Sequence, residues 1–598
     1  MKHSNEAPHY RVEAADRDAH LFQVTLTVPR PAAEQRVMLP VWIPGSYLVR
    51  EFARHLQGLQ ARQGARACRV IHEDKCSWTI ECDPSRPLQL HYQVWARDAS
   101  VRAAWLDTER GFFNATSLCL RVEGAADVCR HELQIVAPDG ARRWRVATAL
   151  RPVRVDARGF GRYTAADYDE LADSPVEMGD FWSGEFDACG VKHRFVVSGA
   201  SANFDGERLL ADAQRICSTA IRFWHPRGRP PHDRYVFLLR ASADGYGGLE
   251  HRHSTALMCA RRDLPRLGEA ALANEGYVGL LGLISHEYFH TWNVKRLRPR
   301  AFERYDYARE NYTDLLWFFE GFTSYYDDLL LRRAGLIDDE TYLKLLAKTI
   351  NQVQQTPGRR VQSLAEASVD AWIKYYRPDE NTPNATVSYY TKGALVGLCL
   401  DLSLRAEGAG SLDAVLRMLW RRSRGGPIDE ADVRAALAEV GARDHAAELD
   451  AWVHGTDELP LSALLERHGV ETLAEPGSWA QRLGVRASES GGTVKLSAVL
   501  RGSVAERAGL AAGDEWLGIE GVGETAGGAW RLNKLDELTL HLRPDAASAV
   551  AWVSRDGRLL RLPIDIPPNT QTVRLRLADA DAAHRWLGAA PARTTANG

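Results

Sequence analysis

The sequence lacks several features that would point away from an ordinary globular protein. No run of about 18 apolar residues occurs, so no membrane-spanning helix is expected. The N-terminal segment has no apolar core of the kind found in secretory signals, so a cytoplasmic location is expected, with the periplasm as the alternative. Neither sign of charge dominates, because 75 Lys and Arg face 78 Asp and Glu, and this balance argues against a nucleic-acid partner.

The cysteines lack a recognisable pattern. There are nine of them, an odd number, and no two form a CxxC pair. Neither a disulfide framework nor a thiolate zinc site is therefore expected, and buried thiols in a reducing compartment are the simplest interpretation. The composition is 45% hydrophobic and 26% charged, which is typical of a soluble globular protein large enough to bury several cores.

The hydrophobic pattern changes twice along the chain. From residue 21 to about 185 it alternates, as at Phe22, Val24 and Leu26, which predicts an antiparallel β domain. Long helical patterns then dominate up to about residue 474, and short strands return beyond 475. The helices expected in the middle part are 207–224, 276–294, 312–334, 340–354, 392–407 and 431–440. The last residues, 576–598, are expected to form a loose C-terminal tail.

Residues 286–290 read His-Glu-Tyr-Phe-His, an HExxH sequence in a proline-free segment that is expected to be helical. On a helix, His286 and His290 lie one turn apart on the same face, so both imidazoles can reach one metal ion. Glu287 stands beside them, near enough to act on a water molecule at the metal. The alternative is a pair of surface histidines with no ligand role.

A third ligand is expected at Glu320, with 29 residues between it and His290. It stands in the aromatic stretch Trp-Phe-Phe-Glu-Gly-Phe, where an ionised carboxylate needs a partner or a metal. Two histidines and a glutamate with one open position form a catalytic zinc site. Asp327 lies two helical turns further on, and it is expected either to orient one histidine or to be a solvated surface acid.

Such a site predicts hydrolysis of a peptide bond. A Zn²⁺ ion lowers the pKa of a bound water molecule to about 7. Glu287 would take the proton of this water and pass it to the leaving amine. The oxyanion that forms needs one hydrogen-bond donor besides the metal.

Several stretches together resemble the glycyl aminopeptidase family of gluzincin metallopeptidases, the thermolysin-like clan with HExxH and a downstream glutamate. They are LPVWIPGSYLVREF at 39–52, GGLEH at 247–251, SHEYFHTWNVKRLRP at 285–299, FFEGFTSYY at 318–326, DENTPNATVSYYTKGAL at 379–395 and the PDZ-like GSVAERAGLAAGDEWLGIEG at 502–521. The resemblance implies an α+β multidomain protein. Its expected parts are an N-terminal β-sandwich-like domain (1–185), a thermolysin-like zinc peptidase domain with a mixed sheet and a helical subdomain (186–474), a C-terminal PDZ-like β domain (475–575) and the tail (576–598).

The resemblance also implies roles for individual residues. Glu287 matches the general base, and Tyr390 matches the tyrosine whose hydroxyl stabilises the oxyanion, with the adjacent Tyr389 as the alternative. The positions that match the zinc ligands are His286, His290 and Glu320.

The segment Gly247, Gly248, Leu249 and Glu250 is similar to the GxMEN segment of related aminopeptidases, in which the glutamate binds the free α-amine of the substrate. His251 departs from the asparagine of those relatives. The resemblance implies an aminopeptidase that releases small N-terminal residues, glycine and alanine, from peptides with a free N-terminus.

Other interpretations of the sequence stay open. If Glu250 does not face the metal, a zinc endopeptidase is the alternative, and a non-catalytic scaffold that binds peptides is a second one. PDZ domains capture peptide C-termini by adding a strand to a sheet edge, and residues 483–485 are the expected carboxylate loop here. The alternative for this domain is that it only packs on the catalytic part. The basic cluster at 295–300 follows a helix C-terminus and is expected to be structural.

Overall fold

The computed structural model describes residues 7–124, 129–270, 274–521, 528–566 and 571–588. The chain forms two compact units that alternate along the sequence. The first unit consists of Met1–Tyr312, Tyr326–Ile337 and Leu416–Asp429. The second consists of Thr313–Tyr325, Asp338–Val415 and Glu430–Gly598.

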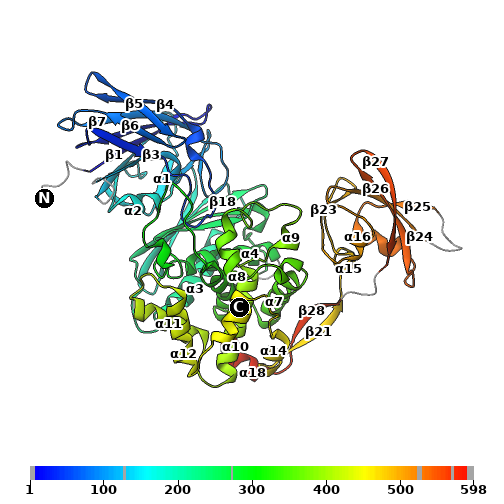
Figure 1. Ribbon diagram of the computed structural model, residues 1–598. Helices are drawn as coiled ribbons and strands as arrows, with labels where there is room; N and C mark the ends of the chain where they lie inside the picture. The colour runs from blue at the N-terminus through cyan, green and yellow to red at the C-terminus, as the bar shows by residue number, and fades with distance from the viewer. Residues whose placement is uncertain (1–6, 125–128, 271–273, 522–527, 567–570, 589–598) are drawn as a thin grey trace. The chain divides into compact units, whose positions relative to one another are not determined.

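The first unit begins with the predicted β domain, drawn in blue and cyan in Figure 1. Its strands are β1 (His9–Asp16), β2 (Leu21–Val28), β3 (Glu34–Met38), β4 (Leu56–Gln63), β5 (Arg66–Asp74), β6 (Ser77–Glu81), β7 (Leu88–Trp95), β8 (Ala104–Leu106), β9 (Arg110–Phe113), β10 (Arg121–Val122), β11 (His131–Val136), β12 (Arg145–Thr148), β13 (Arg151–Val155), β14 (Gly161–Ala165) and β15 (Val176–Gly179). They form an eleven-stranded sheet of order β10-β3-β6-β5-β4-β7-β2-β1-β11-β14-β13 and a four-stranded sheet of order β12-β15-β9-β8. Short helices α1 (Ala115–Leu118) and α2 (Tyr168–Ala172) lie between strands.

The predicted alternation is present in β2, where Phe22, Val24 and Leu26 are buried. The strand pairs of this domain are antiparallel, as expected, except that β1 pairs with β11 in parallel. Side chains alternate in the same way in parallel and antiparallel strands, so the sequence pattern does not reveal this exception.

A third sheet supports the predicted HExxH helix. Its strands are β16 (Trp182–Ala188), β17 (Val191–Ser198), β18 (Arg234–Ser242), β19 (Gly247–Glu250) and β20 (Ser254–Ala260), in the order β16-β17-β18-β20-β19. Two helices pack with it and with each other, namely α3 (Gly206–Trp224) and α4 (Glu275–Phe289). β19 lies at an edge of this sheet and contacts α4.

The helix predicted at 276–294 ends earlier than expected. α4 stops at Phe289, and His290 is its C-terminal cap. The ring of His290 donates from Nδ1 to the carbonyl oxygen of Asn293 at 2.7 Å, and Val294 adopts a positive φ of 137°. A residue with a positive φ cannot continue a right-handed helix, so the chain turns away soon after the second histidine.

The second unit is mainly helical. Its helices up to residue 467 are α5 (Leu316–Phe319), α7 (Asp339–Gln354), α8 (Leu364–Val369), α9 (Thr382–Ala385), α10 (Thr391–Ala406), α12 (Glu430–Gly441), α13 (Ala446–Leu449) and α14 (Leu461–Arg467). Two further helices, α6 (Gly321–Arg333) and α11 (Leu412–Ser423), have residues in both units. The single helix predicted at 312–334 is divided into α5 and α6, and Glu320 is the residue at the break.

Two glycines bring α6 and α10 into backbone contact. A Cβ on Gly321 would lie 2.6 Å from the Cα of Gly393, and a Cβ on Gly393 would lie 2.7 Å from the carbonyl oxygen of Trp317. Any larger residue at either position would push the helices apart. This contact places Glu320, next to Gly321, near the residues that begin α10.

The β domain of the second unit is an insertion between two paired strands. β21 (Val470–Pro476) pairs with β28 (Gln571–Leu577), as Figure 1 shows. In this pairing Pro476 stands opposite Gln571. Between them lie α15 (Trp479–Leu483), β22 (Val485–Ser490), β23 (Thr493–Val499), α16 (Val504–Arg507), β24 (Glu515–Gly521), β25 (Ala529–Arg531), α17 (Leu538–His541), β26 (Ser548–Arg555) and β27 (Arg558–Asp565).

The C-terminal end differs from the expected loose tail. Residues 580–587 form α18 (Ala580–Leu587), in which Trp586 is fully buried. The indole N–H of Trp586 donates to the hydroxyl of Tyr325 at 3.0 Å, and Asn351 of α7 exchanges two hydrogen bonds of 2.7 Å with the backbone of Val573 in β28. Only residues 589–598 of the predicted tail lie outside the described residues.

Candidate metal and peptide site

The two histidines of the HExxH sequence face each other at the end of α4. Nε2 of His286 and Nε2 of His290 are 3.1 Å apart. Each ring donates from its Nδ1 atom, because its partner there is an acceptor: Asp327 Oδ2 for His286 at 3.1 Å and the Asn293 carbonyl for His290 at 2.7 Å. Both Nε2 atoms therefore carry lone pairs that point toward one place, an arrangement that suits a cation.

The place of Asp327 answers a question that the sequence left open. Its carboxylate orients the ring of His286 and is not a solvated surface acid. Ser285 also donates its hydroxyl to the carbonyl of Asp327 at 2.9 Å, so α4 and α6 are joined twice at this point.

Glu287 lies against the backbone of β19. The side chain is 6% exposed, and a Cβ on Gly248 would lie only 2.0 Å from its Oε1 atom. Glycine is therefore required at position 248 for the carboxylate of Glu287 to occupy this place. The predicted GGLEH segment and the HExxH helix meet here.

Glu250, at the end of β19, also faces this centre. One carboxylate oxygen of Glu250, one of Glu287 and a ring nitrogen of His290 all lie within 4.8 Å of one another. Glu250 is 4% exposed, and its Oε1 atom has no hydrogen-bond partner among the described residues. A Cβ on Gly45 would lie 2.6 Å from either carboxylate oxygen, so a turn of the N-terminal β domain covers Glu250.

Arg102 of the N-terminal β domain is a residue that the sequence reasoning missed. Its Nη2 atom donates to the carbonyl oxygen of Gly248 at 3.1 Å. Nothing in the sequence around position 102 marks it, because the contact joins positions 146 residues apart.

The second unit contains Glu320 and the two predicted tyrosines. Glu320 is 2% exposed and Tyr389 is fully buried, whereas Tyr390 is half-buried. Burial first, and then the charge of Glu320, raise the pKa of Tyr390 well above its usual range. Burial and Glu320 also raise the pKa of Tyr375, a third tyrosine, whose ring lies 5.3 Å from that of Tyr390.

A buried hydrogen-bond chain supports α4 from behind. Tyr288 donates its hydroxyl to Nε2 of His193 at 2.9 Å and accepts from Nε2 of His232 at 3.1 Å, while Nδ1 of His193 donates to the carbonyl of Val191. Burial lowers the pKa of His193 to about 4 and is the main cause that lowers the pKa of His232 to about 2. Both rings are therefore neutral at pH 7, as the chain requires.

Two family models match the chain. The M61 glycyl aminopeptidase model matches residues 279–396, and the peptidase M61 N-terminal domain model matches residues 9–180. The crystal structure of an aminopeptidase N family protein from Idiomarina loihiensis is 35% identical, covers 97% of this chain and 100% of that chain, and superposes with a TM-score of 0.91.

More distant structures include an M1 zinc metallopeptidase from Deinococcus radiodurans, which is 15% identical, covers 76% of this chain and 95% of that chain, and has a TM-score of 0.46. This likeness is too low to carry an argument. No curated protein matches the chain.

The fold and the matched models define a peptidase. The chain belongs to the M61 glycyl aminopeptidase family, as the motifs in the sequence indicated. The predicted α+β multidomain architecture, with an N-terminal β domain, a helical catalytic region and a further β domain, is confirmed. Within the described residues, none of the helices is both long enough and apolar enough to cross a membrane.

Proposed function

We propose that this protein is a zinc aminopeptidase that removes small N-terminal residues, glycine or alanine, from peptides. The paired Nε2 atoms of His286 and His290, 3.1 Å apart with both Nδ1 atoms donating elsewhere, carry this proposal. Tetrahedral zinc holds nitrogen ligands at about 2.0–2.1 Å, which separates two of them by about 3.3 Å. The pair therefore fits zinc without rearrangement.

Glu320 is proposed as the third ligand. Glu320 matches the downstream glutamate of the HExxH family motif, and its carboxylate is buried, at 2% exposed, in an aromatic stretch. Glu320 directly precedes α6, and Asp327, two turns along the same helix, already orients the ring of His286. With Glu320 as the ligand, Glu287 serves in catalysis and Glu250 in substrate binding.

The residues around the metal ligands supply the steps of hydrolysis. Zinc, when bound, acts as a Lewis acid and lowers the pKa of a water molecule. Glu287 takes the proton of the attacking water and passes it to the leaving amine. Tyr390 donates its hydroxyl to the oxygen of the scissile carbonyl, a role that its partial exposure and its raised pKa support better than the full burial of Tyr389 does.

Glu250 is proposed to bind the α-amine of the substrate. Its carboxylate is buried beside Glu287, at the end of an edge strand along which an extended peptide can lie. The donor atoms of Glu250 and Glu287 lie within 4.8 Å of each other, a separation that suits an amine and a scissile carbonyl on the same residue. The turn at Gly45 closes the site behind Glu250, which favours an aminopeptidase over an endopeptidase.

The inserted β domain is proposed to bind peptide C-termini along β22, which lies at a sheet edge. The carboxylate loop expected at residues 483–485 gives this proposal little support. Gly484 caps α15, and its N–H already donates to the carbonyls of Ala480 and Gln481.

Chelation tests the metal requirement. Dialysis against a chelator is expected to abolish hydrolysis of alanine p-nitroanilide, and stoichiometric zinc is expected to restore it. Metal analysis of His286→Ala should show loss of bound zinc. Activity that survives complete removal of metal would exclude this mechanism.

The substitution Glu250→Ala tests the aminopeptidase assignment. Loss of a buried carboxylate that binds an ammonium is expected to lower kcat/KM for alanine p-nitroanilide at least about a hundredfold. Internal cleavage of an N-acetylated peptide should be negligible in both proteins. An enzyme that cleaves acetylated and free peptides equally would be an endopeptidase.

A further inference from the structure

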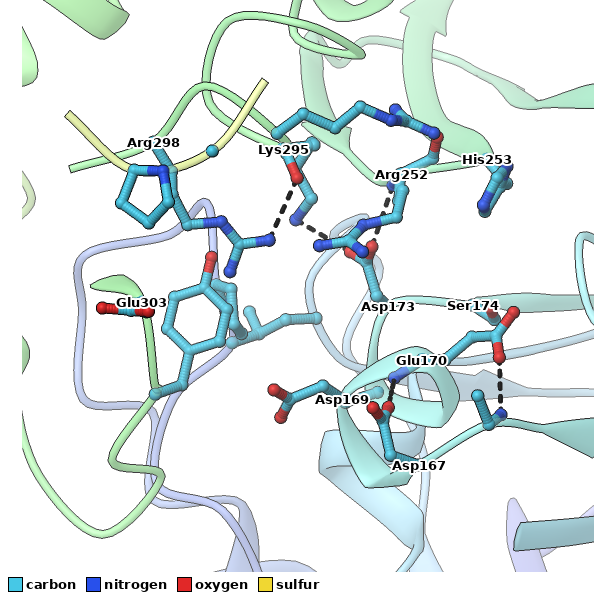
Figure 2. A pocket seen from close by; sticks show the side chains of 18 of the residues that line it. Asp167, Asp169, Glu170, Asp173, Ser174, Arg252, His253, Lys295, Arg298 and Glu303 are labelled. Carbon is cyan, nitrogen blue, oxygen red and sulfur yellow. Dashed lines mark hydrogen bonds and ion pairs between the residues drawn. The ribbon is translucent and has the colours of Figure 1, made fainter. Parts of the chain in front are cut away.

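Asp173 of the N-terminal β domain binds three donors from the peptidase part of the first unit. Its Oδ1 atom accepts from Nζ of Lys295 at 2.8 Å and from Nδ1 of His251 at 3.1 Å. Its Oδ2 atom accepts from the backbone N–H of Arg252 at 2.9 Å. Figure 2 shows the carboxylate pointing toward Lys295 and Arg252. One side chain thus fixes two positions directly after β19 and one in the loop after α4.

These partners surround Glu250. His251 and Arg252 follow it in the chain, and Lys295 is close enough to respond to its charge. Burial alone would lower the pKa of Lys295, but the charges of Asp173, Tyr305 and Glu250 outweigh it and raise this pKa. Lys295 is 3% exposed, so its ammonium is charged, buried and within the field of two carboxylates.

Of these two carboxylates, Asp173 forms the ion pair with the ammonium of Lys295. Oε1 of Glu250 has no partner among the described residues. Were Lys295 bound to Glu250 instead, the charge of that carboxylate would be neutralised and a substrate amine would have to displace the lysine. An unpaired buried charge destabilises the folded protein, so a buried ammonium without its partner is expected to pair with another nearby carboxylate.

The surroundings of Lys295 are not fully packed. Lys295 and Asp173 line a cavity of about 500 Å³. In Figure 2, Lys295, Arg252 and Arg298 lie along one side of it, and Asp169 and Glu170 lie opposite. Space beside Lys295 is therefore unfilled, and its ion pair with Asp173 is the contact that sets the direction of its ammonium.

We propose that Asp173 is a positioning residue of the amine-binding site, which holds the ammonium of Lys295 away from Glu250 and fixes the end of the strand that carries Glu250. This inference rests on the proposed role of Glu250. It also gives the ring of His251 a role, because its Nδ1 atom donates to Asp173. The N-terminal β domain is thereby part of the specificity site.

Three variants test the proposal with alanine p-nitroanilide: Asp173→Asn, Lys295→Met and the two combined. Asp173→Asn keeps the shape of the side chain but frees Lys295 to pair with Glu250, and KM is expected to rise at least about tenfold with little change in kcat. Lys295→Met alone should have a KM within about threefold of the wild type. The double variant should return to that value, because no ammonium is left to block Glu250.

Asp169→Asn is the matched control, since Asp169 lies on α2, lines the same cavity and accepts from Tyr307 at 2.8 Å. Its KM should stay near the wild-type value with or without Lys295→Met. A double variant as impaired as Asp173→Asn alone, or an unchanged KM in Asp173→Asn, would overturn the proposal.

A crystal structure of Asp173→Asn separates this proposal from the proposed function. Nζ of Lys295 is expected at hydrogen-bond distance, about 3 Å, from a carboxylate oxygen of Glu250. A lysine that stays beside residue 173 contradicts the inference whatever the enzyme hydrolyses. A wild-type protein inactive on aminoacyl anilides would overturn the function and leave this structural result standing.

Discussion

Gly247 and Gly248 are adjacent and yet face different surroundings. A Cβ on Gly248 would lie 2.0 Å from Oε1 of Glu287, whereas a Cβ on Gly247 would meet only Nη1 of Arg102 at 3.6 Å, an ordinary contact. The first contact is impossible without displacing the carboxylate that we propose as the general base. The second requires no movement.

Gly248→Ala is therefore expected to reduce kcat at least about a hundredfold, the usual contribution of a general base, and Gly247→Ala only severalfold. Steady-state kinetics of both variants, with thermal melting to confirm folding, checks the difference. Equal losses in the two variants would mean that β19 acts through its conformation and not through room for Glu287.

The sequence predicted those residues whose partners lie nearby in the chain. His286, Glu287 and His290 follow from one helical turn, and Glu320 stands out because a carboxylate is rare among aromatic residues. Asp173 and Arg102 act through contacts that join distant segments, and their local sequences carry no signal, while Lys295 stood out only as part of a basic cluster without an assigned partner. The sequence did not indicate Tyr375, whose ring lies beside that of Tyr390 in the structure.

At the scale of elements, α4 depends on a neutral hydrogen-bond chain behind its catalytic face. The folded protein holds the pKa of His193 near 4, below the value of about 6.5 in an unfolded chain. Between these values the unfolded state binds more protons, so the free energy of unfolding falls as the pH falls from 6.5 toward 4. The lowered pKa of His232 also makes the free energy of unfolding fall as the pH falls.

His193→Gln is expected to be less stable than the wild type at pH 7 but to lose less on acidification. The slopes of unfolding free energy against pH should differ by about 1.4 kcal/mol per pH unit between pH 5 and 6, the value for one proton. Urea titrations of both proteins at several pH values measure this. Parallel slopes would show that His193 is already protonated in the folded protein.

The helical patterns located most helices but not their ends. The helix at 276–294 stops at Phe289, shortly before Val294 takes a positive φ of 137°, and the helix at 312–334 breaks at Glu320. In both cases the interruption falls at a proposed metal ligand. A hydrophobic pattern shows which face of a segment is buried, but it does not show where the backbone leaves the helical conformation.

For the whole molecule, the position of α18 decides which truncations are tolerated. Removing everything after residue 474 would delete β28 and α18 and uncover the site of Trp586, whose loss alone should cost about 3–5 kcal/mol. Pro476 and Gln571, in contrast, already stand opposite each other. A two-residue Asn-Gly turn can therefore replace residues 477–570.

The excised protein is expected to fold and to hydrolyse alanine p-nitroanilide with a kcat/KM within about tenfold of the full chain. Some loss is expected because Asn384 would give up its hydrogen bonds to Val499 and Arg501, close to Tyr390 in sequence. The protein truncated at 474 is expected to unfold at a lower temperature. An excised protein that folds but is inactive would make the β domain part of the catalytic machinery.

The ribbon of β21 and β28 makes the inserted domain a removable cassette. The chain enters the inserted domain after Pro476 and leaves it before Gln571, and these two residues are paired neighbours. Insertion, loss or exchange of the whole domain therefore leaves the backbone of the helical part unaltered. Homologues with a different module at this place, or none, are to be expected. The same junction offers a graft point at which a foreign recognition domain can be attached to the peptidase.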